Sequence, residues 1–401
     1  MVNATKVLLK SIFFLAALSL LGCHPSLKRQ VQRPEEALIP INFFYPHFQD
    51  DMELDSLIQA IKRNIEYLDR LDPEKIFHYG PHNFSCLQVK NSQYDFLKLI
   101  TQKSDPSQIN KEIKKHFCVY RAAGRVGNNS VLFTGYFEPI FDARLTPDQT
   151  FKYPVYRKPQ DLIKVDLSLF NKKYKGESII ARINGKEVVP YYSREQIEME
   201  RALEGQYLEI AWLRDPVDVA FLHIQGSGRL RLPDGNTISV GYHEKNGRPY
   251  RSIGRYMIDR NIISRDQMSM QNIRSYLSEH PEMVDKVLNH NPSYVFFRVL
   301  KEGPLGNIGV PLTPGRSLAL DTRLFPKGAL GFISCKKPVI DDHGNISRWT
   351  KFSRFVLNQD TGGVIKGAGR ADIFWGSGKY AEIAAGHMQN DGQLYILIKK
   401  P

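Results

Sequence analysis

The chain has 401 residues, of which 42% are hydrophobic and 24% are charged, so it is long enough for one large or two smaller globular domains with an ample core. Its formal net charge of +13 favours a polyanionic partner, either nucleic acid or an acidic polymer of the cell envelope. The sequence has no long basic block, zinc-finger spacing or basic helix, and this disfavours nucleic acid as the partner.

The first 22 residues are predicted to be a signal peptide. Lys6 and Lys10 precede an apolar run over residues 12–21, which is too short to span a bilayer and is followed by Gly22 and Cys23. A small residue before a cysteine is typical of lipoprotein cleavage sites, so we expect Cys23 to be lipidated. Removal of Lys6 and Lys10 would lower the net charge from +13 to +11.

The residue after Cys23 is histidine and not aspartate, which in bacterial lipoproteins indicates export to the outer membrane. We therefore expect an outer-membrane lipoprotein whose bulk faces the periplasm. A signal peptide that is simply cleaved is the alternative. Residues 23–48 are polar and contain prolines, and they are predicted to form the lipid-anchored tether.

Residues 49–133 are predicted to form an N-terminal helical part. Apolar residues from Leu54 to Leu68 follow helical spacing, and Asp105-Pro106 has the form of a helix start. In an oxidising compartment the three remaining cysteines allow at most one disulfide. Cys86 with Cys118 is the favoured pair, and buried unpaired thiols are the alternative.

Residues 134–292 are predicted to form a second β-domain that follows a strand over residues 131–139. Ser193 has the capping-box form and should start a helix that runs to about Leu203. An apolar segment over residues 217–228 is interpreted as a strand that ends in a turn, where Gln225 and Ser227 could hydrogen-bond a sugar. Within it, His223 is interpreted as a core imidazole.

Two further stretches complete this second β-domain. Residues 248–256 bring arginines and tyrosines together around Arg251, which suits sugars and carboxylates, although a solvated surface patch explains them equally well. Residues 264–277 and 281–288 are predicted to be helices.

Residues 293–401 are predicted to form a compact, glycine-rich β unit, opened by a strand over residues 294–299 and containing a hairpin turn at residues 341–345. A strand over residues 355–359 runs into Asp360, and glycines then allow a tight connection to a second strand with Asp372. Asp360 alone could simply be a turn residue. Asp372 is harder to explain in that way, because strands disfavour aspartate and a buried charge must be paired.

Three motifs in this unit resemble the three-aspartate double-psi β-barrel family. They are Asp321-Thr322-Arg323, Gln359-Asp360-Thr361-Gly362-Gly363 and Ala371-Asp372-Ile373-Phe374. Together with residues 133–139, 225–228 and 250–254, they make the chain similar to the membrane-bound lytic murein transglycosylase A family. The similarity runs from about Leu132 to the C-terminus, and Phe137-Glu138 departs from it where a second tyrosine and a neutral residue are expected.

This resemblance implies a mainly β fold with N-terminal helices (α+β), in which a double-psi β-barrel and an inserted β-domain enclose a groove. It implies peptidoglycan glycan strands as the substrate, cut between N-acetylmuramic acid and N-acetylglucosamine to leave 1,6-anhydromuramic ends, with no cofactor and no metal. By motif position Asp372 is the acid/base, with Asp360 and Asp321 nearby. The expected substrate contacts are Tyr136, Gln225, Ser227, Arg251, Lys366 and Trp375. We expect a monomer with no nucleic-acid partner.

The chemistry of Asp372 supports this assignment independently. Glycosidic cleavage needs a protonated acid for the leaving oxygen, and an apolar strand should raise the pKa of Asp372. A neighbouring Asp360 carboxylate should act in the same direction. Two alternatives remain: an inverting hydrolase with Asp360 or Asp321 as base, and a non-catalytic peptidoglycan-binding lipoprotein. A binder has no need of an acid on an apolar strand, and this favours an enzyme.

Overall fold

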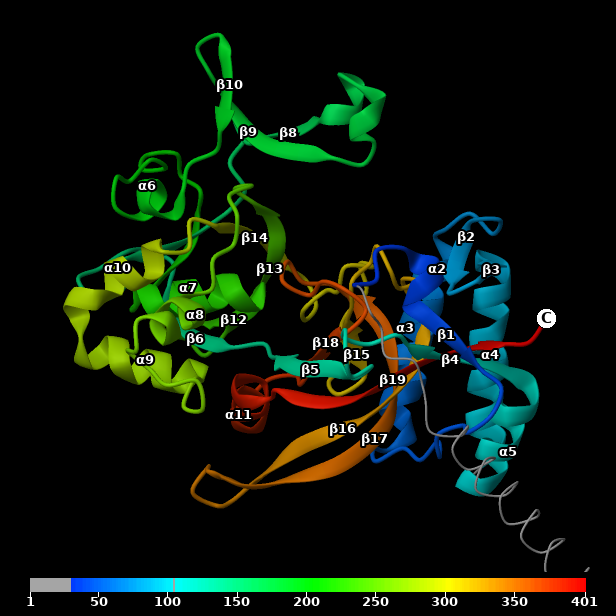
Figure 1. Ribbon diagram of the computed structural model, residues 1–401. Coiled ribbons are helices and arrows are strands. Elements are labelled where there is room, and N and C mark those ends of the chain that lie inside the picture. Colours follow the sequence, from blue (N-terminus) through cyan, green and yellow to red (C-terminus); the bar gives the residue numbers. More distant parts are fainter. Residues whose placement is uncertain (1–29, 104) are drawn as a thin grey trace, which may run out of the picture.

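The computed structural model describes residues 30–103 and 105–401, so the predicted signal peptide and Cys23 lie outside the described residues. Its largest feature is a closed β-barrel, within the described part of the chain, of six strands: β5 (Val131–Tyr136), β15 (Ser317–Ala319), β16 (Leu330–Ile340), β17 (Ile346–Asp360), β18 (Arg370–Phe374) and β19 (Asn390–Lys399). They pair in the order β19-β16-β17-β15-β18-β5, and β5 pairs back with β19 (Figure 1). The pairs β15–β17 and β18–β5 are parallel.

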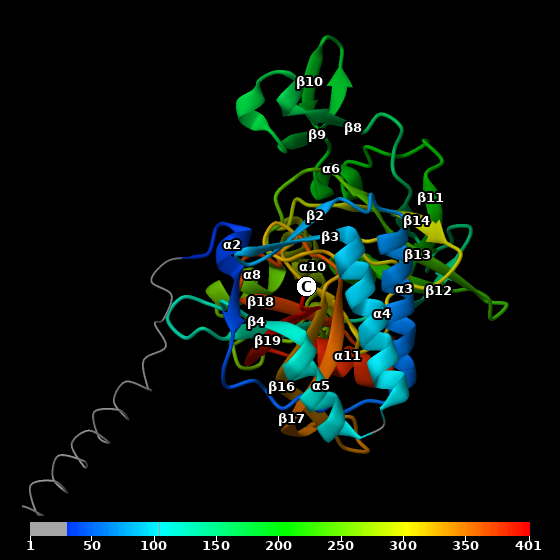
Figure 2. The ribbon, with the colours of Figure 1, turned by 90° about the vertical axis from the view of Figure 1, so that its right-hand side faces the viewer.

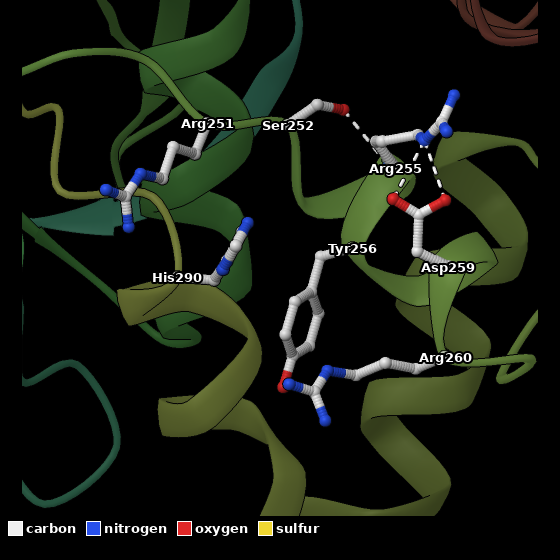
Figure 3. A pocket seen from close by; sticks show the side chains of 7 residues that line it. All are labelled: Arg251, Ser252, Arg255, Tyr256, Asp259, Arg260 and His290. Atoms are coloured by element: carbon white, nitrogen blue, oxygen red, sulfur yellow. Dashed lines mark hydrogen bonds and ion pairs between the residues drawn. The ribbon is translucent and has the colours of Figure 1, made fainter.

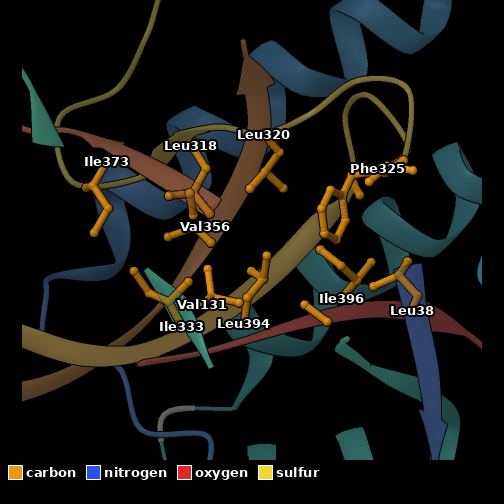
Figure 4. Packing of buried hydrophobic residues seen from close by; sticks show 14 of the residues in the cluster. Leu38, Val131, Leu318, Leu320, Phe325, Ile333, Val356, Ile373, Leu394 and Ile396 are labelled. Carbon is orange, nitrogen blue, oxygen red and sulfur yellow. The ribbon is translucent and has the colours of Figure 1, made fainter. Parts of the chain in front are cut away.

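The inside of the barrel is filled by apolar side chains that alternate along each strand with outward-facing residues. Every barrel strand contributes to this core, as Figure 4 shows for Val131, Leu318, Ile333, Val356, Ile373 and Leu394. Because Leu318 and Ile373 point inward, their neighbours Ala319 and Asp372 point to the outer surface of the barrel. The core therefore determines which side the acidic side chains face.

Two more strands extend the barrel sheet beyond β19. Strand β4 (Phe117–Ala122) pairs with β19, and β1 (Leu38–Ile41) pairs with β4. The tether predicted for residues 23–48 is therefore wrong in its second half, where a short helix α2 (Pro34–Ala37) precedes β1 and the Phe48 ring packs on Phe332. Burial of these apolar side chains stabilises the folded state more than a solvated tether could.

The predicted N-terminal helices are present and cover one side of the barrel. They are α3 (Leu54–Asp69) and α5 (Pro106–His116). Helix α4 (Cys86–Gln102), which the sequence analysis does not predict, packs beside α3, and a hairpin of β2 (Ile76–Tyr79) and β3 (His82–Ser85) precedes it (Figure 2). Asp105 caps α5 as expected, because its carboxylate accepts a hydrogen bond from the Ser107 N–H. The apolar face of α3 packs on β17.

Cys86, Cys118 and Cys335 are free thiols, and the disulfide favoured between Cys86 and Cys118 is not formed. Burial raises the pKa of each thiol. Cys86 and Cys335 are therefore buried packing residues, as in the alternative interpretation, whereas Cys118 is only half-buried.

The second domain is built on a six-stranded sheet with the order β14-β13-β12-β6-β11-β7. Its strands are β6 (Ile140–Arg144), β7 (Tyr153–Tyr156), β11 (Glu209–Leu213), β12 (Ser227–Arg231), β13 (Thr237–Lys245) and β14 (Val295–Leu300). Strand β14 pairs with β13, so the prediction that this segment opens the barrel is wrong. Its buried Phe296 and Phe297 pack inside the second domain.

Helices surround this second sheet. They are α6 (Arg194–Glu198), α7 (Pro216–Gln225), α8 (Ile253–Asp259), α9 (Met270–Glu279) and α10 (Val284–Asn289), with a 3₁₀ turn η3 (Pro281–Met283) before α10. Ser193 forms the predicted capping box, but α6 ends at Glu198 and not near Leu203. The predicted helix over residues 264–277 starts later, at Met270.

The segment predicted as a strand over residues 217–228 is largely helix α7. Asp215 caps its start, Pro216 occupies the first turn, and Gly226 ends it in a left-handed conformation with φ of 75°. An apolar run of this length is compatible with either a strand or a buried helix, and here the flanking cap signals decide for the helix.

The remaining elements lie at two edges of the molecule. Helix α11 (Lys379–His387) packs against β5 of the barrel. A separate three-stranded sheet of β8 (Ile163–Asp166), β9 (Ser178–Asn184) and β10 (Glu187–Pro190), with the 3₁₀ turns η1 (Leu167–Leu169) and η2 (Lys172–Tyr174), projects from the second domain (Figures 1 and 2). This architecture confirms the predicted fold class.

Candidate active site

Asp360 and Asp372 lie on either side of the short central strand β15. Ala319 in β15 is paired with Asp372 in β18 and with Asp360 at the end of β17. Neighbouring strands are about 4.8 Å apart, so the Cα atoms of the two acids are about 10 Å apart. Because Ala319 has only a methyl group, no large side chain from β15 separates the two carboxyl groups.

Among the described residues, only one oxygen of the Asp372 carboxyl group accepts a hydrogen bond. Its Oδ1 accepts a hydrogen bond of 2.6 Å from the hydroxyl of Thr134, the residue opposite it in β5. Burial raises the pKa of Asp372 to about 6, although the Thr134 hydroxyl and the charge of Arg370 act in the opposite direction. An acid with this pKa and a free oxygen can donate a proton to a bound substrate near neutral pH.

Asp360 is held by three hydrogen-bond donors. Its Oδ1 accepts from the backbone N–H groups of Asn307, at 3.0 Å, and Thr361, at 2.8 Å, and its Oδ2 accepts from the hydroxyl of Tyr136 at 2.7 Å. Burial, helped by the charge of Asp372, still raises the pKa of Asp360 to about 6 against these three bonds. Since backbone N–H groups can only donate, they favour the ionised form, and we infer that Asp372 holds the proton of the pair.

Asp321 is a structural anion. It is almost completely buried, it forms a two-pronged ion pair with Arg323, and it accepts a hydrogen bond of 2.8 Å from the Gly367 N–H. Burial alone would raise the pKa of Asp321, but these donors outweigh burial and lower it to about 2. An acid with this pKa stays ionised at neutral pH, so Asp321 cannot act as the proton donor. Its hydrogen bond with Gly367 instead holds the loop between Asp360 and Asp372.

Comparison with known proteins identifies the family. The model of the MltA specific insert domain matches residues 132–298, and that of the 3D domain matches residues 316–398. A membrane-bound lytic murein transglycosylase A of Escherichia coli is 31% identical over 285 residues, which cover 70% of this chain and 69% of that protein. The chain belongs to the lytic murein transglycosylase A family.

Two further relatives support this assignment. The protein of the same name from Vibrio cholerae is 32% identical over 271 residues, and the match covers 67% of this chain and 65% of that protein. A membrane-bound lytic murein transglycosylase from Agrobacterium tumefaciens has a solved structure with a TM-score of 0.73 and 32% identity, covering 90% of this chain and 98% of that one. The match to the insert domain also agrees with the placement of β14 in the second sheet.

Among the predicted substrate contacts of this family member, Tyr136 contacts Asp360, and Gln225 contacts the residue that follows Tyr136. Gln225 ends α7, and its side-chain oxygen accepts a hydrogen bond of 3.0 Å from the N–H of Phe137, the residue after β5. Ser227 follows in β12 and is buried. Gln225 thus connects the second domain to the end of the strand that holds Thr134 and Tyr136.

Trp375 and Lys366 occupy contrasting positions. The Trp375 ring is buried between Phe352 and Tyr380 and packs against Gly135, where a Cβ atom would lie 2.5 Å from the indole nitrogen. Trp375 therefore packs against β5, and because its ring is buried, little of the ring surface is available to contact a glycan. Lys366 is exposed on the loop that Asp321 holds.

Arg251 lines a different cavity. This cavity of about 610 Å³ lies in the second domain, and none of the three aspartates contributes to it (Figure 3). Its lining is cationic, because Arg251, Arg255 and Arg260 surround the tilted rings of Tyr256 and His290, with Asp259 paired to Arg255. Contact between Arg251 and the substrate held by the aspartates stays a prediction.

Glu138, where the chain departs from the family pattern, links the two domains. Its side chain is buried and forms an ion pair of 2.9 Å with Arg229 of β12, and its N–H donates to the Gly376 carbonyl after β18. Burial raises the pKa of Glu138 despite the nearby Arg229. Glu138 thus forms a contact at the junction of the two domains.

Sequence reasoning gave no role to Thr134 and did not single out Asn307. The signal for Thr134 was present, since it lies two residues before Tyr136 on a strand and must share its face. Asn307 contributes only a backbone N–H, which no residue pattern reveals. No group of His, Cys, Asp or Glu side chains suited to a metal ion occurs within residues 30–103 and 105–401.

Proposed function

We propose that this protein is a lytic transglycosylase that cleaves peptidoglycan between N-acetylmuramic acid and N-acetylglucosamine and leaves 1,6-anhydromuramic ends. The observation that supports it most directly is the pair of unlike carboxyl groups on the outer face of the barrel. Both have a pKa raised to about 6, but Asp372 accepts a hydrogen bond from one hydroxyl among the described residues, whereas Asp360 accepts from three donors that favour its charge. Family membership supports the same reaction.

The proposed mechanism uses Asp372 twice. It first donates its proton to the glycosidic oxygen, and the bond from that oxygen to the muramic C1 breaks as positive charge develops on the sugar ring. The muramic 6-hydroxyl then attacks C1 and forms the anhydro ring, and its proton passes to the Asp372 carboxylate. Acid and base are therefore restored without a water molecule.

Asp360 contributes charge in this mechanism. Its carboxylate, about two strand spacings from Asp372, stabilises the positively charged sugar ring and favours the protonated form of its neighbour. Tyr136 and the two backbone N–H groups hold Asp360 ionised for this purpose. Thr134 orients Asp372 through its hydroxyl, so that Oδ2 remains available to the substrate.

Intramolecular attack explains why a water-activating base is not required. The 6-hydroxyl belongs to the bound sugar and has a high effective concentration at C1, which favours it over water. Glycans without muramic acid, such as plain chitin, should be cleaved poorly.

We further propose that the protein works as a monomer on glycan strands from the periplasmic face of the outer membrane, anchored through lipidated Cys23. No helix in the described residues is both long and apolar enough to cross a bilayer. The net charge, +13 for the whole chain and +11 without Lys6 and Lys10, suits an acidic wall polymer, and nucleic acid is not an expected partner.

The test is to digest purified sacculi with the unlipidated protein and to determine the masses of the released muropeptides. Anhydro ends are lighter than reducing ends by one water, so the products of transglycosylation and hydrolysis separate. We expect anhydro ends to predominate. Predominantly reducing ends would contradict the proposal and favour the inverting hydrolase, and an absence of cleavage would favour the peptidoglycan-binding lipoprotein.

A further inference from the structure

The projecting sheet of β8, β9 and β10 has one apolar face, on which several side chains are exposed around the buried Ala181. Cross-strand partners lie on the same face of a sheet, and here they are apolar: Val165 pairs with Ile179, and Ile183 pairs with Val188. Ile179, Ile183 and Val188 are all exposed. The opposite face is occupied, because Ile180 packs on the core of the second domain. The exposed apolar side chains therefore lie on the face opposite the one that packs on the second domain.

The turn at the end of this sheet is also apolar. Leu169, which ends η1, and Phe170, which follows it, expose 83% and 76% of their surface. Exposed apolar patches of this kind mark surfaces that contact a partner or a membrane. Both views place this turn at the edge of the molecule, beyond the second domain (Figures 1 and 2).

Lysines surround the turn. Lys172, Lys173 and Lys175 follow Phe170 within five residues and are exposed, and no ion pair joins them to another described residue. Residues 163–190 contain six basic and three acidic side chains, which is a net charge of +3. The turn thus combines two features of a bilayer-binding surface: large apolar side chains that can enter the interface, and cations that can reach anionic headgroups.

A second exposed apolar pair provides a comparison within the same chain. Phe43 and Phe44 expose 78% and 85% of their surface, but the nearest charged residues in the sequence are Asp50 and Asp51. This pair lacks the cations of the Leu169–Phe170 turn. Charge complementarity to an anionic surface therefore distinguishes the turn from an ordinary exposed aromatic pair.

We propose that the β8–β10 sheet is a membrane-docking element, which inserts Leu169 and Phe170 into the interface of an anionic phospholipid bilayer while Lys172, Lys173 and Lys175 contact lipid phosphates. This contact is additional to any acyl anchor and independent of the proposed catalytic activity. It orients the molecule on the lipid surface, since the sheet is attached to the second domain through its other face.

The test measures vesicle binding by the mature chain from His24 onward, made without its leader so that no acyl chain is present. Vesicles of phosphatidylcholine with phosphatidylglycerol are compared with vesicles of phosphatidylcholine alone. We expect binding to the anionic vesicles only, weakened by salt. The double variant Leu169→Ser/Phe170→Ser and the triple variant Lys172→Gln/Lys173→Gln/Lys175→Gln should each bind at least about tenfold more weakly.

Phe43→Ser/Phe44→Ser is the matched control and should bind as the unsubstituted chain does. All variants should keep their melting temperature and their activity on sacculi, because the substituted side chains are exposed and lie outside the barrel. Any of three results would overturn the proposal. The chain could bind both kinds of vesicle equally, the double or triple variant could bind as the unsubstituted chain does, or the Phe43/Phe44 control could lose as much binding as they do. No binding to anionic vesicles would also overturn it and favour a protein partner for this face.

Discussion

Replacing Tyr136 by phenylalanine tests whether the charge of Asp360 depends on its hydrogen bonds. The hydroxyl of Tyr136 donates to Asp360 at 2.7 Å and is one of three donors to this carboxylate. A hydrogen bond to a charged group contributes about 1.5–3 kcal/mol, and one pKa unit corresponds to about 1.4 kcal/mol. Loss of the hydroxyl should therefore raise the pKa of Asp360 by about 1 to 2 pH units.

The sign of the effect on the rate follows from the proposed mechanism. With a pKa of about 6, Asp360 is mostly ionised at pH 7. A higher pKa in the variant would protonate it there, so kcat/KM at pH 7 should fall about two- to tenfold. The ratio of variant to wild-type rate should return toward one as the pH rises, because Asp360 then ionises again. The acid limb of the pH–rate profile belongs to the Asp360–Asp372 pair and should move toward higher pH.

The assay is the release of muropeptides from sacculi over a range of pH, with Tyr395→Phe as the control. Tyr395 also lies in the barrel, in β19, and its hydroxyl has no hydrogen bond to either aspartate. The control should keep the wild-type profile. A Tyr136→Phe profile that coincides with wild type would refute the idea that this hydroxyl keeps Asp360 charged, and a loss of equal size at every pH would indicate a purely positional role.

Three other substitutions test separate parts of the proposal. Asp372→Asn should lower the cleavage rate ~10²–10⁴-fold with fold and sacculus binding retained, and a rate within about tenfold of wild type would exclude Asp372 as the general acid. Asp360→Asn should be milder, whereas an equal loss would indicate a two-carboxylate mechanism. Asp321→Asn should lower the free energy of unfolding by about 1–2 kcal/mol at pH 7, measured by urea unfolding. Because the pKa of Asp321 is lowered to about 2, the contribution of Asp321 to stability is present above about pH 4 and is lost as the pH falls toward 2. Cys23→Ser should release the protein into the soluble periplasmic fraction at high salt, where the proposed contact of the β8–β10 sheet is also weakened, with its activity on sacculi intact. Membrane attachment that persists at high salt would place the anchor elsewhere.

Much of the local structure could be predicted because its signals are local. The cap at Asp105, the capping box at Ser193 and the amphipathic helix α3 each follow from residues within one or two turns of each other. The prediction failed for α7, where an apolar run fits both a strand and a buried helix. It failed for β14 as well, since an apolar strand does not specify which of two sheets it joins.

The sequence by itself determined that Asp372 would be an unusual acid, because a carboxyl group between Ala371 and Ile373 on an apolar strand has to be partly desolvated. Only the tertiary structure decided how the three aspartates differ. Thr134 and Tyr136 lie 238 and 224 residues from the carboxyl groups they contact, and Asn307 reaches Asp360 from a loop after the inserted domain. A pKa depends on every donor and charge within a few ångströms, whatever its distance along the chain. For that reason the pKa of Asp321 is lowered to about 2 and that of Asp372 is raised to about 6, although both lie in similar motifs of one barrel.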